Sequence, residues 1–91
     1  MDIEKYLRRV GMKTFVEYYK IFEDLTIERK EILSLLEKEN FTKNSCDTKA
    51  SVGRTIFKKN MEKLALKLIS NSDKVDSDIK EKAKKLLLTR G

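Results

Sequence analysis

The sequence predicts an all-α fold, a compact bundle of five to six short helices in one domain spanning residues 1–91. The chain has no proline and only three glycines, whereas a sheet protein of this length needs several tight turns built with such residues. Lysine, glutamate and leucine, all good helix formers, are abundant. Apolar residues make up 40% of the chain and recur at helical spacing. That fraction supplies one modest core.

The first half of the chain contains three predicted helices. The first covers residues 2–10 and is expected to end at Gly11. The second is expected to begin with Thr14 as its cap and to run to about Glu23. Its six bulky residues in eight positions imply burial on more than one side, so it should lie at the centre of the core. They are Phe15, Val16, Tyr18, Tyr19, Ile21 and Phe22.

A third helix is predicted over residues 27–39 with Thr26 as its N-cap. Phe41 follows in the connection and is expected to fill the corner between helices. A fourth helix is predicted over residues 42–59, capped by Thr42 or Asn44. It contains Gly53, and a glycine inside a helix costs roughly 1 kcal/mol relative to alanine. The helix therefore either continues through Gly53 or stops there.

The remaining chain predicts one or two further helices. Asn60 either breaks the chain before a fifth helix or bends a longer fourth one. The run Ser70-Asn-Ser-Asp73 is the clearest loop in the sequence. Asp76 or Ser77 can then cap a last helix. One side of this helix is apolar and the other is basic; its apolar residues are Ile79, Ala83, Leu86 and Leu87.

Several classes of function are excluded by what the chain lacks. Without histidine there can be no Ser-His-Asp triad, Cys-His pair or histidine metal ligand. Cys46 is the only cysteine, so it forms no disulfide within the chain and is expected on the buried side of its helix. We expect no catalytic activity, no metal, no cofactor and no small-molecule substrate. No apolar run approaches the roughly 18 residues of a membrane-spanning helix and no signal peptide is visible, so a cytoplasmic protein without membrane contact is expected.

The positive charge lies in the second half of the chain. Residues 1–41 contain eight basic and nine acidic residues, a net charge of −1. Residues 42–91 contain thirteen basic and six acidic residues, a net charge of +7. Such asymmetry is typical of a surface that binds a polyanion.

The predicted pair of helices at 27–39 and 42–59 resembles a helix-turn-helix. That motif needs a short turn, small residues where the helices cross, and an exposed polar face on the second helix. Ala50 and Gly53 supply the close approach. Lys43 and Asn44 lie at the N-terminus of the second helix, where free backbone N–H groups favour phosphate. The expected base readers are Asn44, Thr48 and Ser51, followed by Arg54 and Thr55, and the expected phosphate contacts are Lys49, Lys58 and Lys59.

The opening residues carry a second resemblance. Tyr6-Leu7, Gly11-Met12, Phe15 and Phe22 look like the start of a sterile alpha motif domain, and Gly53-Arg54 with Ile56 and Leu64 resembles the start of its long last helix. This resemblance implies a five-helix bundle used for protein association or, in some members, for binding RNA hairpins.

The sequence therefore supports two hypotheses. The first is a small helix-turn-helix regulator that binds double-stranded DNA, commonly as a homodimer joined through the first or last helix. The usage of lysine, isoleucine and asparagine favours an AT-rich source such as a phage, plasmid or low-GC bacterium. The alternative is a non-enzymatic protein–protein interaction module whose basic residues only solvate its surface.

Overall fold

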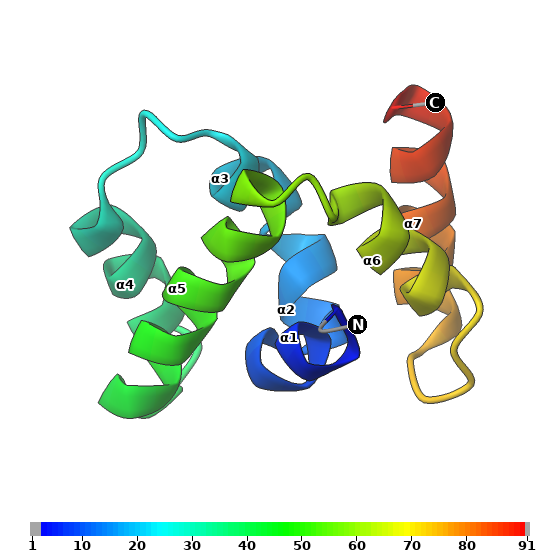
Figure 1. The fold of residues 1–91 in the computed structure, drawn as a ribbon. Helices are drawn as coiled ribbons and strands as arrows, with labels where there is room; N and C mark the ends of the chain where they lie inside the picture. The colour runs from blue at the N-terminus through cyan, green and yellow to red at the C-terminus, as the bar shows by residue number, and fades with distance from the viewer. Residues whose placement is uncertain (1–2, 91) are drawn as a thin grey trace.

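A computed structural model describes residues 3–90, and these residues form seven α-helices and no strand. Figure 1 shows how they are arranged. The predicted all-α fold is confirmed. The helices are α1 (Ile3–Val10), α2 (Met12–Glu17), α3 (Tyr19–Glu23), α4 (Arg29–Glu37), α5 (Lys43–Lys58), α6 (Glu62–Ser70) and α7 (Ser77–Arg90).

Local sequence signals set several helix ends as expected. Gly11 ends α1 with φ of 86°, a left-handed conformation that glycine adopts without steric cost. Thr42 is the N-cap of α5, and its hydroxyl accepts a hydrogen bond from the Ser45 amide at 3.2 Å. Asn60, with φ of 58°, separates α5 from α6. The fourth predicted helix therefore ends there and a fifth begins.

Two predicted helix starts are wrong. Thr14 does not cap a helix; it lies buried inside α2, and the predicted second helix is divided at Tyr18 into α2 and α3. This division explains why there are seven helices rather than five or six. Thr26 does not cap α4 either, because its amide and hydroxyl donate to the Asp24 carboxylate at 3.0 and 2.6 Å. That local turn delays α4 until Arg29, with Glu28 as its N-cap.

α5 lies between α4 on one side and α1 and α3 on others (Figure 1). Its small residues Ala50 and Gly53 are both buried. A Cβ atom on Gly53 would come within 2.7 Å of the Phe22 ring of α3. α5 continues through Gly53 without a break, and the missing side chain of Gly53 lets α3 and α5 approach this closely.

An aromatic cluster joins α2 and α3 to the C-terminal half of α5. The Phe15 and Tyr19 rings meet edge to face at 5.6 Å between centroids, and Tyr19 meets Phe57 in the same manner at 4.9 Å. Such contacts add to the stabilisation from burying the rings. The expectation that the segment Phe15–Phe22 lies in the core is confirmed, since Phe15, Val16, Tyr19 and Phe22 are all buried.

The last two helices pack mainly against each other, on the side of the molecule away from α4 (Figure 1). Residues 71–76 connect them, which includes most of the predicted loop. The first turn of α7 is bonded to the Asp76 carbonyl by the amides of Ile79 and Lys80, at 3.0 and 3.1 Å. Ile79 and Ala83 are buried, as the apolar side of this helix predicted.

Candidate nucleic-acid interface

The outward side of α5 carries most of the residues that the sequence singled out. Asn44, Thr48 and Ser51 are exposed, as are Lys43 and Lys58, and Thr55 is half-buried. We refer to these six residues as the α5 outer face. Their spacings of one, four, three, four and three residues place them along one side of a helix of sixteen residues. The face is continuous because Gly53 does not interrupt the helix.

The polar groups of the α5 outer face differ in how free they are. The hydroxyl of Thr55 donates to the Ser51 carbonyl at 2.8 Å, so its proton is used within the helix. Asn44 and Thr48 make no side-chain hydrogen bond with any residue in the described range 3–90. These two side chains are therefore the ones that can meet a base edge without first breaking a contact.

Arg29 reaches the α5 outer face from the first turn of α4. Its NH1 donates to the Ser51 hydroxyl at 2.9 Å, and its NH2 lies 3.3 Å from an Asp47 carboxylate oxygen. Both charged side chains are about half exposed, at 46% and 48%. Sequence reasoning missed Arg29. Its position in the first turn of a predicted helix was the one available signal. The helix dipole disfavours a cation there, so a compensating partner from another segment was to be expected.

Lys49 was expected to contact phosphate, and the structure places its side chain away from the α5 outer face. Its side chain is half-buried, and its Nζ donates to the Val10 carbonyl at the end of α1 at 2.8 Å. The same ammonium lies 4.6 Å from the centre of the Phe41 ring. Burial lowers the pKa of Lys49 below its usual range. Lys49 therefore joins α1 to α5 and does not belong to the outer face.

Arg54 was expected to read bases, and it too turns inward. Its NH2 donates to the Ile27 carbonyl in the segment before α4, and its Nε is buried with no hydrogen-bond partner in the described part of the chain. The charge of Arg54 also contributes to lowering the pKa of Asp24, after the two hydrogen bonds from Thr26. Arg54 thus holds the 24–28 connection against α5. The exposed polar face predicted for the second helix therefore lacks Lys49 and Arg54.

Cys46 lies on the inner side of α5, as predicted. It is buried, its Sγ lies 3.8 Å from the Phe41 carbonyl, and burial raises the pKa of the thiol. A protonated, inaccessible thiol is a poor nucleophile. Cys46 is therefore part of the packing between α5 and the Phe41 turn.

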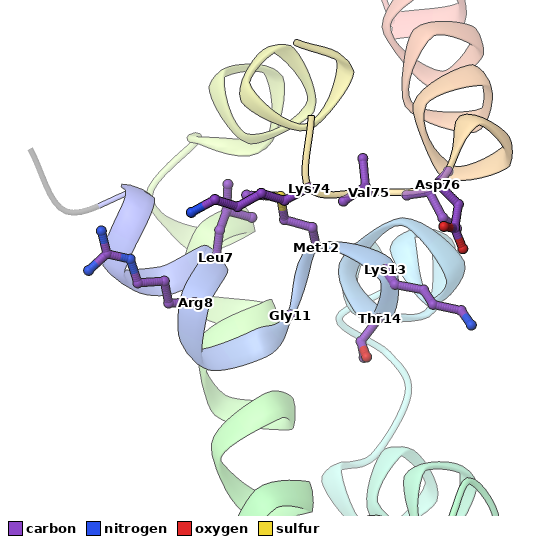
Figure 2. A pocket seen from close by; sticks show the side chains of 10 residues that line it. Leu7, Arg8, Gly11, Met12, Lys13, Thr14, Lys74, Val75 and Asp76 are labelled. Carbon is purple, nitrogen blue, oxygen red and sulfur yellow. The ribbon is translucent and has the colours of Figure 1, made fainter. Parts of the chain in front are cut away.

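A second surface feature lies between α1 and the connection before α7. Two adjoining hollows of about 390 and 310 Å³ share Leu7, Arg8, Met12 and Lys74. We call them together the α1 groove. The larger hollow is bounded by α1, the corner at Gly11 and the connection before α7, and ends at Asp76. Figure 2 shows Lys74 extending past Met12 toward the end of the groove where Arg8 lies. Nothing in the linear pattern indicated this groove, because its walls come from the two ends of the chain, residues 4–14 and 68–79.

Within residues 3–90, no helix combines the length and apolar character that a membrane crossing requires. In the same range, no three side chains of His, Cys, Asp or Glu gather in a way that could hold a metal ion. A scan against protein-family models matches no family, and searches of curated proteins and of solved structures return no match.

Proposed function

We propose that this protein is a non-enzymatic double-stranded DNA-binding domain that places the α5 outer face in the major groove. The observation that carries the proposal is the continuity of α5. The helix runs through Gly53, so Thr55 and Lys58 extend the line of the exposed side chains of Asn44, Thr48 and Ser51. A helix of this length is about 24 Å long. The major groove admits a single helix of ordinary width.

Each part of the face has a role in this proposal. Asn44 and Thr48 read base edges, because their polar groups are free. Lys43, beside the free N–H groups of the first turn of α5, and Lys58 at the other end contact phosphates on the two sides of the groove. Arg29 lies at the edge of the same face. A phosphate can compete with Asp47 for its guanidinium, since this pair is half exposed.

The basic second half of the chain adds attraction that is independent of sequence. The experiment must therefore separate the α5 outer face from general charge. One double variant carries Lys43→Glu and Lys58→Glu together. The matched control is a second double variant that carries Lys84→Glu and Lys85→Glu. All four lysines are exposed, and both double variants change the net charge equally. Binding to a labelled duplex is measured by fluorescence polarisation at several salt concentrations.

The α5 double variant should lose affinity by about tenfold or more at low salt, and its plot of log affinity against log salt should be shallower by about 2, one for each lost phosphate contact. The α7 control should keep most of its affinity. Equal losses in the two variants would mean that binding depends on overall charge and not on α5. Undetectable duplex binding by the unaltered chain at low salt would refute the proposal altogether.

The proposal includes a symmetric dimer, the form in which helix-turn-helix proteins bind two half-sites. The last helix supplies the exposed apolar surface that a seam needs. Leu88 of α7 is 82% exposed, the most exposed large apolar side chain in the part of the chain that is described. The proposal places Leu88 in the seam, where α7 of the second copy would cover it.

A further inference from the structure

The α1 groove combines an apolar floor with a cationic end, and this combination serves no purpose in the DNA-binding proposal. We infer that the α1 groove is a docking site for a peptide segment of a partner protein that carries an acidic side chain next to an apolar one. This inference does not depend on the α5 outer face.

The floor of the groove is apolar. Leu7 and Ile79 are buried beneath it, and Met12 and Val75 are partly exposed along it. A hollow of about 390 Å³ lies within the range of sites that hold small ligands or single large side chains. A leucine, methionine or phenylalanine side chain placed there would remove apolar surface from water on both partners. The flexible Met12 can adapt to the shape of such a side chain.

The cations at one end of the groove have no partner among the residues that the structure describes. Neither Arg8 nor the Lys74 ammonium forms a hydrogen bond or an ion pair with any of the residues 3–90. Glu4 lines the same end but pairs with neither of them. Figure 2 shows that Lys74 and Arg8 both extend toward this end, while Lys13 and Asp76 lie toward the other. Two unpaired cations beside an apolar hollow are complementary to one carboxylate beside one apolar side chain.

The distribution of acidic residues distinguishes a peptide from nucleic acid. Glu4 lies at one end of the groove and Asp76 at the other. A continuous polyanion crossing the groove would meet both carboxylates and would leave the apolar floor unused. A single peptide carboxylate between Arg8 and Lys74 meets only Glu4 and avoids Asp76, and its neighbouring apolar side chain uses the floor. The charges therefore favour a peptide over a nucleic-acid backbone.

The test uses the full chain and a displayed library of short random peptides as the probe. Peptides selected on the unaltered protein are measured by fluorescence polarisation against the double variant Arg8→Gln with Lys74→Gln. The control is Lys84→Gln with Lys85→Gln, which removes the same charge from the exposed side of α7. Arg8 and Lys74 are both exposed, and circular dichroism checks that each variant keeps its helix content.

Selected peptides should carry Asp or Glu within two positions of a large apolar residue. Their affinity should fall about tenfold in the groove variant, as expected for losing two partly exposed charge contacts, and should not change in the control. In heteronuclear NMR spectra, the amides of Met12 and Val75 should shift on titration. The inference would be overturned if the selected peptides lacked this pattern. It would also be overturned if their affinity were the same for the groove variant and the unaltered protein.

The duplex assay separates this inference from the proposed function. The groove variant should bind the duplex as the control variant does. If it loses duplex affinity as strongly as the Lys43 and Lys58 variant, the groove cations serve a polyanion and the peptide site is refuted. If the chain binds no duplex but binds the selected peptides through Arg8 and Lys74, only the DNA proposal fails.

Discussion

Gly53 is the residue on which the close packing of α5 against α3 depends. The Phe22 ring occupies the space that a side chain at position 53 would need, with three ring atoms 2.7–2.8 Å from an ideal Cβ position. Phe22 is fully buried and cannot swing into solvent. The roughly 1 kcal/mol that glycine costs inside a helix is thus offset by close packing between α3 and α5.

Gly53→Ala should therefore destabilise the protein even though alanine is the better helix former. Overpacking of a filled core costs about 1–3 kcal/mol, and improved helix propensity returns roughly 1 kcal/mol. We expect a net loss of up to about 2 kcal/mol in the free energy of unfolding, measured by urea denaturation. Thr48→Ala, on the outer face of the same helix, is the control and should change stability by less than about 0.5 kcal/mol. A Gly53→Ala variant as stable as the unaltered chain would show that Phe22 moves aside without cost.

The elements are joined by contacts that are distant in sequence, and these limited what the sequence could predict. Gly11, Thr42 and Asn60 act on their own neighbours, so their roles as helix ends were predictable from residue type. The inward turn of Lys49 depends on Val10, which lies 39 residues away. Arg54 depends on Ile27, 27 residues away. A helical pattern alone places both cations at the edge of the polar face, and only the packing of α1 and of the 24–28 connection shows that they turn inward.

The contact between α1 and α5 should respond to pH through Lys49. Burial lowers the pKa of this ammonium in the folded protein, below the 10.5 of an exposed lysine. Between these two values the unfolded chain binds more protons than the folded chain, so the free energy of unfolding should rise as pH increases through this window. The destabilisation caused by the buried charge of Lys49 is fully present below the folded-state pKa. It disappears above about pH 10.5, where Lys49 is neutral in both states.

Lys49→Met removes this titration. Stability is measured by urea denaturation from neutral pH into the lysine range, and the difference between the unaltered chain and Lys49→Met should move in favour of the unaltered chain as pH rises. Lys85→Met, at an exposed position on α7, should leave the pH profile of stability unchanged. A difference that moves in the opposite direction would mean that the folded state stabilises the charged form of Lys49 and that its hydrogen bond to Val10 outweighs its burial.

At the scale of the whole molecule, size decides whether two copies can serve one DNA site. The chain measures about 30 × 25 × 24 Å along its principal axes. Half-sites one helical turn apart are separated by about 34 Å. In the proposed dimer, two copies packed side by side would have their centres about 24–30 Å apart, which is of the same order as one turn of the duplex.

The dimer proposed through α7 depends on Leu88. Leu88→Lys should keep the helix content of the protein, because the side chain is 82% exposed, and should shift the mass measured by sedimentation equilibrium from dimer to monomer. Thr89→Lys adds the same charge at the next exposed position and is the matched control. The Leu88 variant should also lose the gain in affinity that a two-half-site duplex offers over a single half-site, since that gain arises from linking two binding events. If the unaltered chain is a monomer, there is no seam. If both variants remain dimers, the seam lies elsewhere. In either case the α5 assay with a single half-site still tests whether the domain itself binds DNA.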